Sequence, residues 1–315
     1  DLYDCTVLIS SHMLSEIELI ADDIGILNHG QLLFEGSMND LRQYALQSGF
    51  AADNLEDVFL SMVEKDNMDR KQKIMKTLVI ELRKEKRTGV IPVLLAVGVL
   101  GATYAFVNFL VRKDTLLNLP LDPMDVLLTQ LYGMIMVLNL FGIVVATCMI
   151  YNMEFKGSAV KKMYMLPVSV SAMYLCKFLI LTVIFFVAIV LQNLTLAQIG
   201  MTYLPEGAFE MGMLVRFAGY SFLTSMPVLS FMLLISSRFE NMWVSLGIGV
   251  AGFLSGMALA NSGLTLLLVH PFVVILKPAV AMSAQPDPMV TFVALAETLL
   301  FLAVGLWLAK YRRYE

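Results

Sequence analysis

Charged side chains are scarce in this sequence. They make up 15% of its 315 residues, whereas hydrophobic side chains make up 58%. Soluble globular proteins carry roughly 25% charged residues, so this chain has too few to cover a water-facing surface around so much apolar content. The net charge of −4 at pH 7 provides no overall positive field for a nucleic acid. The composition excludes a disordered chain, a nucleic-acid-binding protein and an ordinary soluble enzyme, and it favours a membrane protein.

Cysteine is equally sparse. The three cysteines, Cys5, Cys148 and Cys176, lie far apart in the sequence. This spacing matches neither a metal site nor a disulfide framework, so we expect them to act as small buried hydrophobic residues. The start of the sequence also lacks the basic and apolar regions of a secretory signal peptide, and none is expected.

The composition changes abruptly near residue 75, which predicts a domain boundary. Residues 1–74 mix polar and apolar side chains as a soluble α/β fragment does, whereas residues 75–315 contain long apolar runs. In the first part we predict a strand, a helix, a hairpin whose turn contains Gly30, and two amphipathic helices. Their expected ranges are 6–10, 13–21, 24–34, 39–47 and 55–64.

Eight lysines and arginines lie between residues 70 and 87. Within this stretch Met75, Leu78, Val79 and Leu82 fall on one helical face, and the charged side chains fall elsewhere. The pattern predicts a helix that lies on a membrane surface with its apolar stripe in the lipid boundary. A soluble linker helix is the alternative.

Six apolar segments are long enough to cross a bilayer, which takes about 20 residues as a helix. They are residues 90–111, 124–151, 171–197, 213–236, 242–260 and 289–309. A seventh stretch, 264–282, contains His270, Pro271, Lys277 and Pro278, so we predict a broken, re-entrant pair of short helices there. Such backbone is tolerated at membrane depth only when it is buried against protein.

The distribution of basic residues predicts the orientation of the spans, because lysine and arginine in short loops mark the cytoplasmic side. With six spans, fifteen basic residues lie on the side of both termini and three, Arg112, Lys113 and Lys277, lie on the other. We therefore expect both termini to be cytoplasmic and the re-entrant pair to lie toward the outside.

The N-terminal segment contains a specific pattern. A strand-like run, residues 6–10, is followed by Ser11-His12, by an acidic helical stretch, and by the hairpin sequence of residues 21–37. This pattern resembles the C-terminal end of an ABC-transporter ATPase domain of the lantibiotic type. The resemblance implies that His12 is the switch histidine, which hydrogen-bonds the ATP γ-phosphate and positions the attacking water.

These 315 residues contain no G-x-x-x-x-G-K-[ST] phosphate loop. We therefore expect the phosphate loop and the catalytic acidic residue to precede Asp1, with ATP and Mg²⁺ bound by a complete ATPase domain. The chain alone is expected neither to bind nor to hydrolyse ATP, although the complete transporter would. Three explanations stay open. The chain is a truncated piece, or the hydrolytic half belongs to a longer product, or Met75 begins a separate permease to which an ATPase tail has become fused, naturally or as an assembly artefact.

The segment between the second and third spans carries a further pattern. It reads Glu-Phe-Lys-Gly-Ser-Ala-Val-Lys-Lys-Met-Tyr-Met-Leu-Pro-Val-Ser over residues 154–169, and Lys177 follows in the next span. This part of the chain resembles the permease of a type-2 ABC exporter, and within that family it is most similar to lantibiotic immunity permeases. The resemblance implies that Glu154, Lys156, Lys161 and Lys162 dock in a cleft of the ATPase. The alternative is a solvated loop that merely follows the charge rule.

Glu297 lies eight residues into the last span, about 12 Å from its outer end at 1.5 Å per residue. A charged carboxylate at that depth is costly unless it is paired. We expect it either to form a structural ion pair with Lys277 or Arg216, or to contact the substrate. Asn108, Asn139, Gln192 and Asn193 are expected to hold helices together by hydrogen bonds.

The sequence thus predicts a mainly α-helical membrane protein of the bacterial plasma membrane, with six spans, an outer re-entrant pair and a preceding α/β ATPase fragment. The resemblances imply a subunit of an ATP-driven exporter of lantibiotic or other antimicrobial peptides. Its expected partners are an ABC ATPase, a second permease copy or a related permease, the lipid bilayer and an amphipathic peptide, but no nucleic acid. Alternatives are a non-transporting membrane anchor or sensor, and an exporter of ions or small drugs.

Overall fold

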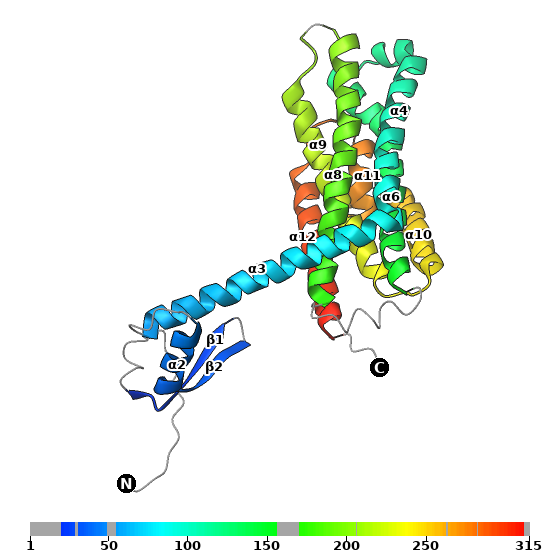
Figure 1. Ribbon diagram of the computed structural model, residues 1–315. Helices are drawn as coiled ribbons and strands as arrows, with labels where there is room; N and C mark the ends of the chain where they lie inside the picture. The colour runs from blue at the N-terminus through cyan, green and yellow to red at the C-terminus, as the bar shows by residue number, and fades with distance from the viewer. Residues whose placement is uncertain are drawn as a thin grey trace. The chain divides into compact units, whose positions relative to one another are not determined.

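The computed structural model describes residues 20–28, 31–48, 55–155, 170–205, 207–262, 264–281 and 283–311. The chain divides into two compact units, Asp1–Lys76 and Thr77–Glu315, and we describe each by itself (Figure 1). His12, the strand expected over residues 6–10 and the expected hairpin turn at Gly30 lie outside the described residues.

The first unit contains the predicted hairpin, which is confirmed. Strand β1, Asp23–Asn28, pairs antiparallel with β2, Gln31–Ser37. Residues alternate along β1, so Ile24 and Ile26 are buried while their neighbours face outward. This two-residue period is what a half-buried strand requires.

Helix α2, Met38–Ser48, follows β2 directly. Its start is fixed by reciprocal hydrogen bonds: the Asp40 amide donates to the Ser37 hydroxyl at 3.3 Å, and the Ser37 amide donates to Asp40 Oδ2 at 3.2 Å. Hydrogen bonds from the Ser37 hydroxyl and from the Ser37 amide to the Asp40 carboxylate lower the pKa of Asp40 below its ordinary value. Leu41 and Ala45, one turn apart, pack with the buried residues of β1 and of the next helix into a small core.

Helix α3 runs from Leu55 to Thr88 without interruption. The sequence prediction of a helix that ends near residue 64 is therefore wrong, because the predicted surface helix continues it. No glycine or proline occurs between Leu55 and Thr88 to break the helix. The helix ends at Gly89, whose φ of +80° is a left-handed conformation that glycine adopts at low cost.

The second unit is a bundle of apolar helices, and its six candidate spans confirm the predicted number. The elements in chain order are α4 (Val90–Leu117), α5 (Pro123–Asp125), the π-helix η1 (Val126–Gln130), α6 (Tyr132–Phe155), α8 (Val170–Tyr203), α9 (Met211–Ser236), α10 (Met242–Ala260), the 3₁₀ helix η3 (Thr265–Val269), α11 (Pro271–Val280) and α12 (Pro288–Tyr311). We call the end of the bundle at which α4 begins the proximal end, and the end at which α4 finishes the distal end.

The stretch over residues 264–282 is broken into η3 and α11, as predicted. Nearly every side chain of α11 is buried, and α11 packs against α6, α9 and α10. Figure 1 shows it inside the bundle. Because protein surrounds it, this short helix satisfies the condition for non-spanning backbone at membrane depth.

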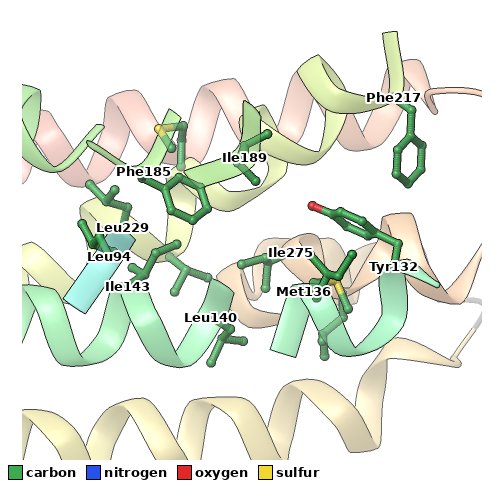
Figure 2. Packing of buried hydrophobic residues seen from close by; sticks show 14 of the residues in the cluster. Leu94, Tyr132, Met136, Leu140, Ile143, Phe185, Ile189, Phe217, Leu229 and Ile275 are labelled. Atoms are coloured by element: carbon green, nitrogen blue, oxygen red, sulfur yellow. The ribbon is translucent and has the colours of Figure 1, made fainter. Parts of the chain in front are cut away.

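Aromatic and branched side chains from several helices fill the bundle core. The rings of Tyr132 and Phe217 meet edge to face with centroids 5.1 Å apart, as Figure 2 shows. The same view places Ile275 of α11 among core residues of the neighbouring helices. The core therefore joins α4, α6, α8, α9 and α11 into one cluster.

A buried amide pair crosses the middle of the bundle. Asn139 Nδ2 donates to Gln192 Oε1 at 3.0 Å, and Gln192 Nε2 donates back to Asn139 Oδ1 at 2.7 Å. Gln192 Nε2 also lies 3.4 Å from the carbonyl oxygen of Val97. The expected hydrogen bonding of Asn139 and Gln192 is therefore confirmed, and it joins α4, α6 and α8. The same expectation is wrong for Asn108 and Asn193, because each bonds within its own helix: Asn108 donates to the Tyr104 hydroxyl at 3.3 Å, and Asn193 donates to the Ile189 carbonyl oxygen at 2.9 Å.

Close packing of α4 against α8 depends on Gly98. A Cβ atom at this position would lie 2.9 Å from the Cα of Ala188, which is backbone and has little room to move. We expect Gly98→Ala to destabilise the bundle by about 1–3 kcal/mol, measured as a lower unfolding temperature in detergent. Gly219→Ala is the matched control because nothing lies within 4 Å of its Cβ position. Equal unfolding temperatures for the two variants would contradict this packing.

Candidate functional site

The predicted coupling segment begins at the proximal end of the bundle. Helix α6 ends at Phe155 and α8 begins at Val170. Of the four predicted docking residues, only Glu154 is described, in the last turn of α6. Lys156, Lys161 and Lys162 lie outside the described residues.

A buried lysine, Lys177, lies at the centre of this region. Its side chain is 1% exposed, and its ammonium nitrogen lies 2.5 Å from Glu81 Oε2, 2.8 Å from Glu154 Oε1 and 3.8 Å from Glu85 Oε1. The three carboxylates come from α3 and α6, whereas Lys177 comes from the second turn of α8. We call Glu81, Lys84, Glu85, Glu154 and Lys177 the charge cluster.

Lys84 supplies the second cation of the charge cluster. Its ammonium nitrogen lies 2.6 Å from Glu81 Oε1 and 3.6 Å from Glu154 Oε1. Glu81 is thus bonded through one oxygen to each lysine. The third carboxylate, Glu85, accepts a hydrogen bond of 2.8 Å from the hydroxyl of Thr88.

The two glutamates of α3 differ in pKa although they lie one helical turn apart. Burial alone raises the pKa of Glu81, but the charge of Lys177 and the hydrogen bonds from both lysines outweigh it, so the pKa is lowered. Burial is the largest influence on Glu85 and raises its pKa, helped by the negative charges of Glu81 and Glu154. Three carboxylates face two ammonium groups, so Glu85 is the group that takes up a proton most readily.

This arrangement fastens three helices at one point. Removing charges from water is costly, and only good geometry with complementary charges compensates for it. The cluster meets that condition through contacts among α3, α6 and α8. Because Glu154 precedes the segment over residues 156–169 and Lys177 follows it, their ion pair also ties together the two helices from which that segment extends.

Glu297 does not form the expected ion pair. Lys277 instead donates to the carbonyl oxygen of Ala260 at 3.0 Å, and the Nε of Arg216 donates to that of Gly212 at 3.2 Å. Both carboxyl oxygens of Glu297 are buried and have no hydrogen-bond partner among the described residues. The expected clamp between Glu297 and either cation is therefore wrong, because each cation caps or bonds local backbone.

Two cavities of different character occur at the distal end. One, of about 260 Å³, is lined by apolar residues of α4 and η1, by the loop after α4, and by Tyr203 at the end of α8. The other, of about 480 Å³, includes Asp122, Glu210 and Arg216 in its lining. An apolar cavity and a polar one thus lie near the same end of the bundle.

Two sequence and structural features bear on nucleotide and metal binding. The sequence has no phosphate loop, and among the described residues no group of three or more His, Cys, Asp or Glu side chains could hold a metal ion.

Comparison with protein families decides the identity of the bundle. The model of the "ABC-2 family transporter protein" family matches residues 77–256, more than half of the chain. The chain belongs to the ABC-2 transporter family. It is a multi-pass membrane protein and the permease component of an ABC transporter, and permeases of this family partner with an ABC ATPase.

A second similarity concerns an ATP-binding protein. A stretch of 40 residues is 60% identical to the "Uncharacterized ABC transporter ATP-binding protein YcbN" of Bacillus subtilis (strain 168). The match covers 13% of this permease chain and 13% of that protein. It therefore relates a short segment, not the whole chain, to an ATP-binding protein.

Sequence reasoning did not single out Glu81, Glu85 or Lys177 as site residues of this permease. A signal was present, because Lys177 is a lone cation in a long apolar run and Glu81 and Glu85 are spaced four apart in a basic stretch. Residues at that spacing share a helix face. Which cation they meet is a long-range contact that this spacing leaves open.

Removing the central cation should destabilise the permease strongly. We expect Lys177→Met to lower the free energy of unfolding by about 3–5 kcal/mol, because it leaves buried carboxylates without their counter-charge. Adding Glu81→Gln should recover part of the loss. The measurement is thermal unfolding in detergent, with Lys113→Met, whose cation lies over the ring of Tyr203, as control. A Lys177→Met protein as stable as this control would contradict the ion-pair interpretation.

The two α3 glutamates should respond to pH in opposite ways. A carboxyl group whose pKa is raised in the folded state contributes stability that is lost as the pH rises. Glu85→Gln should therefore become progressively more stable than wild type above pH 4.5, which is the ordinary pKa of a glutamate. Glu81 has a lowered pKa, so Glu81→Gln should be less stable than wild type above that pH and approach it below. Unfolding temperatures measured across the pH range check both signs, and parallel curves for the two variants would refute them.

Proposed function

We propose that this permease is the membrane-spanning subunit of an ATP-driven exporter, and that residues 152–168 dock on its ATPase. The observation that carries this proposal is the charge cluster. It binds together the two helices that bracket the docking segment and the helix that enters the bundle. A displacement of the segment is therefore passed to α3, α6 and α8 together, since packed elements move as units.

The basic character of the segment supports docking as well. Lys156, Lys161 and Lys162 lie within seven residues, and a compact group of cations can steer association with an acidic surface. The same charges support a cytoplasmic position for the proximal end, as the positive-inside rule requires. Both termini are then cytoplasmic and the two distal cavities face the outside.

The N-terminal segment supports a link to ATP hydrolysis. Its resemblance to an ATPase C-terminus extends over about the first 37 residues, a length close to that of the 40-residue similarity to an ATP-binding protein. On this proposal His12 contacts the γ-phosphate in a complete ATPase domain, where ATP and Mg²⁺ are bound. No step of that reaction is assigned to the residues that the structure describes.

An amphipathic peptide of the lantibiotic class is the proposed cargo. The resemblance of residues 154–169 to lantibiotic immunity permeases motivates it, and the neighbouring apolar and charged cavities suit a molecule with one face of each kind. An ion would need a continuous polar path, and the described spans are predominantly apolar. The second permease in the complex, identical or related, is part of the same proposal.

Neutralising the docking segment should uncouple the transporter. We expect Lys161→Gln with Lys162→Gln, in the complete transporter in lipid nanodiscs, to lose co-purification with the ATPase and most of the ATP hydrolysis of the complex. Neutralising Arg112 and Lys113 in the same way is the matched control, because it removes the same number of charges at the distal end. If both double variants retain the ATPase equally, docking through this segment is excluded.

The cargo is tested by protection of a sensitive bacterium. Cells carrying the complete operon should tolerate a several-fold higher concentration of a lantibiotic than cells in which His12 is replaced by alanine. Equal protection would exclude ATP-linked export and favour the anchor or sensor alternative. Stimulation of ATP hydrolysis by ions or small drugs, and not by the peptide, would favour the alternative of an exporter of ions or small drugs.

A further inference from the structure

Glu297 lies in the middle of α12 and is shielded from its surroundings. The residue is 6% exposed, and both of its carboxyl oxygens are buried without a hydrogen-bond partner among the described residues. It is the tenth residue of a 24-residue helix, so about 14 Å of helix separates it from the start of α12. The carboxyl group therefore lies at membrane depth.

The side of α12 that carries Glu297 faces the bundle. Val290 and Ala294 are buried on the preceding two turns. Phe301, one turn on, has its ring 5.2 Å from that of Phe231 in α9, and a Cβ at Gly305 would meet the ring of Tyr174 in α8. These positions recur every three to four residues and form one stripe, so Glu297 points between α12 and its neighbours and not into lipid.

The cations of the neighbouring helices are engaged elsewhere. Arg216 of α9 and Lys277 of α11 bond the carbonyl oxygens of Gly212 and Ala260. Lys177 of α8 is surrounded by carboxylates. No counter-charge among the described residues therefore balances Glu297.

The neutral donors of the neighbouring helices do not bond Glu297. The hydroxyl of Thr182 in α8 is buried without a hydrogen-bond partner, and both carboxyl oxygens of Glu297 also lack one among the described residues. Four hydroxyl groups of α9 donate their single hydrogens to carbonyl oxygens of α9 itself; they belong to Ser221, Thr224, Ser225 and Ser230. The tyrosines of the adjoining helices lie at other levels: Tyr174 is beside Gly305, two turns from Glu297, and Tyr220 is level with Asp287. None of these groups stabilises a negative charge at Glu297.

We propose that Glu297 is a membrane-embedded proton-binding site, whose carboxyl group is neutral while the bundle is closed. A charged carboxylate without partner or water is strongly disfavoured in this environment. A proton is the one counter-ion that needs neither a cavity nor a second ligand. Ionisation then requires that α12 and α9 separate far enough to admit water. The bound proton therefore stabilises the closed state, in which the two helices are in contact.

The neutral form can be trapped chemically. An apolar carbodiimide, dicyclohexylcarbodiimide, reacts with a protonated carboxylic acid: the acid proton moves to a carbodiimide nitrogen, the carboxylate oxygen adds to the central carbon, and the adduct rearranges to a stable N-acylurea without loss of atoms. Glu297 is the only acidic residue of α12, so mass spectrometry of the peptide assigns the adduct. Glu81 and Glu154, buried but bonded to Lys177, are internal controls.

We expect Glu297 to be modified at neutral pH by this reagent in lipid nanodiscs, and not by a water-soluble carbodiimide. Modification should fall as the pH is raised and be absent in Glu297→Gln. Glu81 and Glu154 should remain unmodified. Modification of all three glutamates alike would overturn the proposal, because it would show that burial and not the lack of a partner decides the reaction.

Infrared spectroscopy provides a measurement that does not depend on access of the reagent. The spectrum of wild type minus that of Glu297→Gln at neutral pH should contain the carbonyl stretch of a protonated carboxylic acid. A carboxylate band in its place would overturn the proposal whatever the labelling result. Neither measurement needs ATP, cargo or an ATPase, so failure here is distinct from failure of the proposed export function.

Protonation of Glu297 in the folded protein also predicts how the stability of the protein changes with pH. Unfolding exposes the carboxyl to water, where it ionises, so raising the pH stabilises the unfolded chain. Wild type should therefore lose unfolding temperature relative to Glu297→Gln as the pH rises from acidic to alkaline values. A difference that is constant with pH would show that Glu297 does not bind a proton in the folded protein.

Discussion

The salt bridges of Lys177 are the constraint on which the proximal part of this permease depends. Three helices that are distant in sequence supply the charges, and none of them can leave without exposing an uncompensated ion in a buried site. Glu154 and Lys177 also bracket the proposed docking segment. The position of that segment is thus tied to the helix that enters the bundle, which is what transmission of an ATPase movement requires.

Polar groups inside the bundle show two different solutions to the same physical problem. Asn139 and Gln192 satisfy each other and the backbone of α4, so they join helices without any need for water. Glu297 has no such partner among the residues that the structure describes. Polar groups at membrane depth are costly unless they are bonded, neutral or functional, and this contrast separates the ionisable Glu297 from Asn139 and Gln192.

Several features could be predicted from residue patterns because they depend on local chemistry. Length and apolarity identified six spans. Two prolines with His270 and Lys277 identified the break over residues 264–282, and the turn residues around Gly30 between two apolar runs identified the hairpin of β1 and β2. The end of the helix that begins at Leu55 was predicted wrongly, since a fall in apolar periodicity does not end a helix when no glycine or proline follows. An ion pair of Glu297 with Lys277 or Arg216 was predicted because all three lie toward the outer side of the spans. In the structure both cations bond nearby carbonyl oxygens instead.

The sequence by itself determined that this protein enters lipid, how many times it crosses, and that a basic segment follows the second crossing, because bilayer thickness and charge placement act on each segment separately. The tertiary structure alone decided that Glu81 and Glu154 meet Lys177 while Glu297 meets no partner. Those outcomes depend on which helix faces pack together, and packing joins residues about a hundred positions apart, beyond what any local pattern encodes.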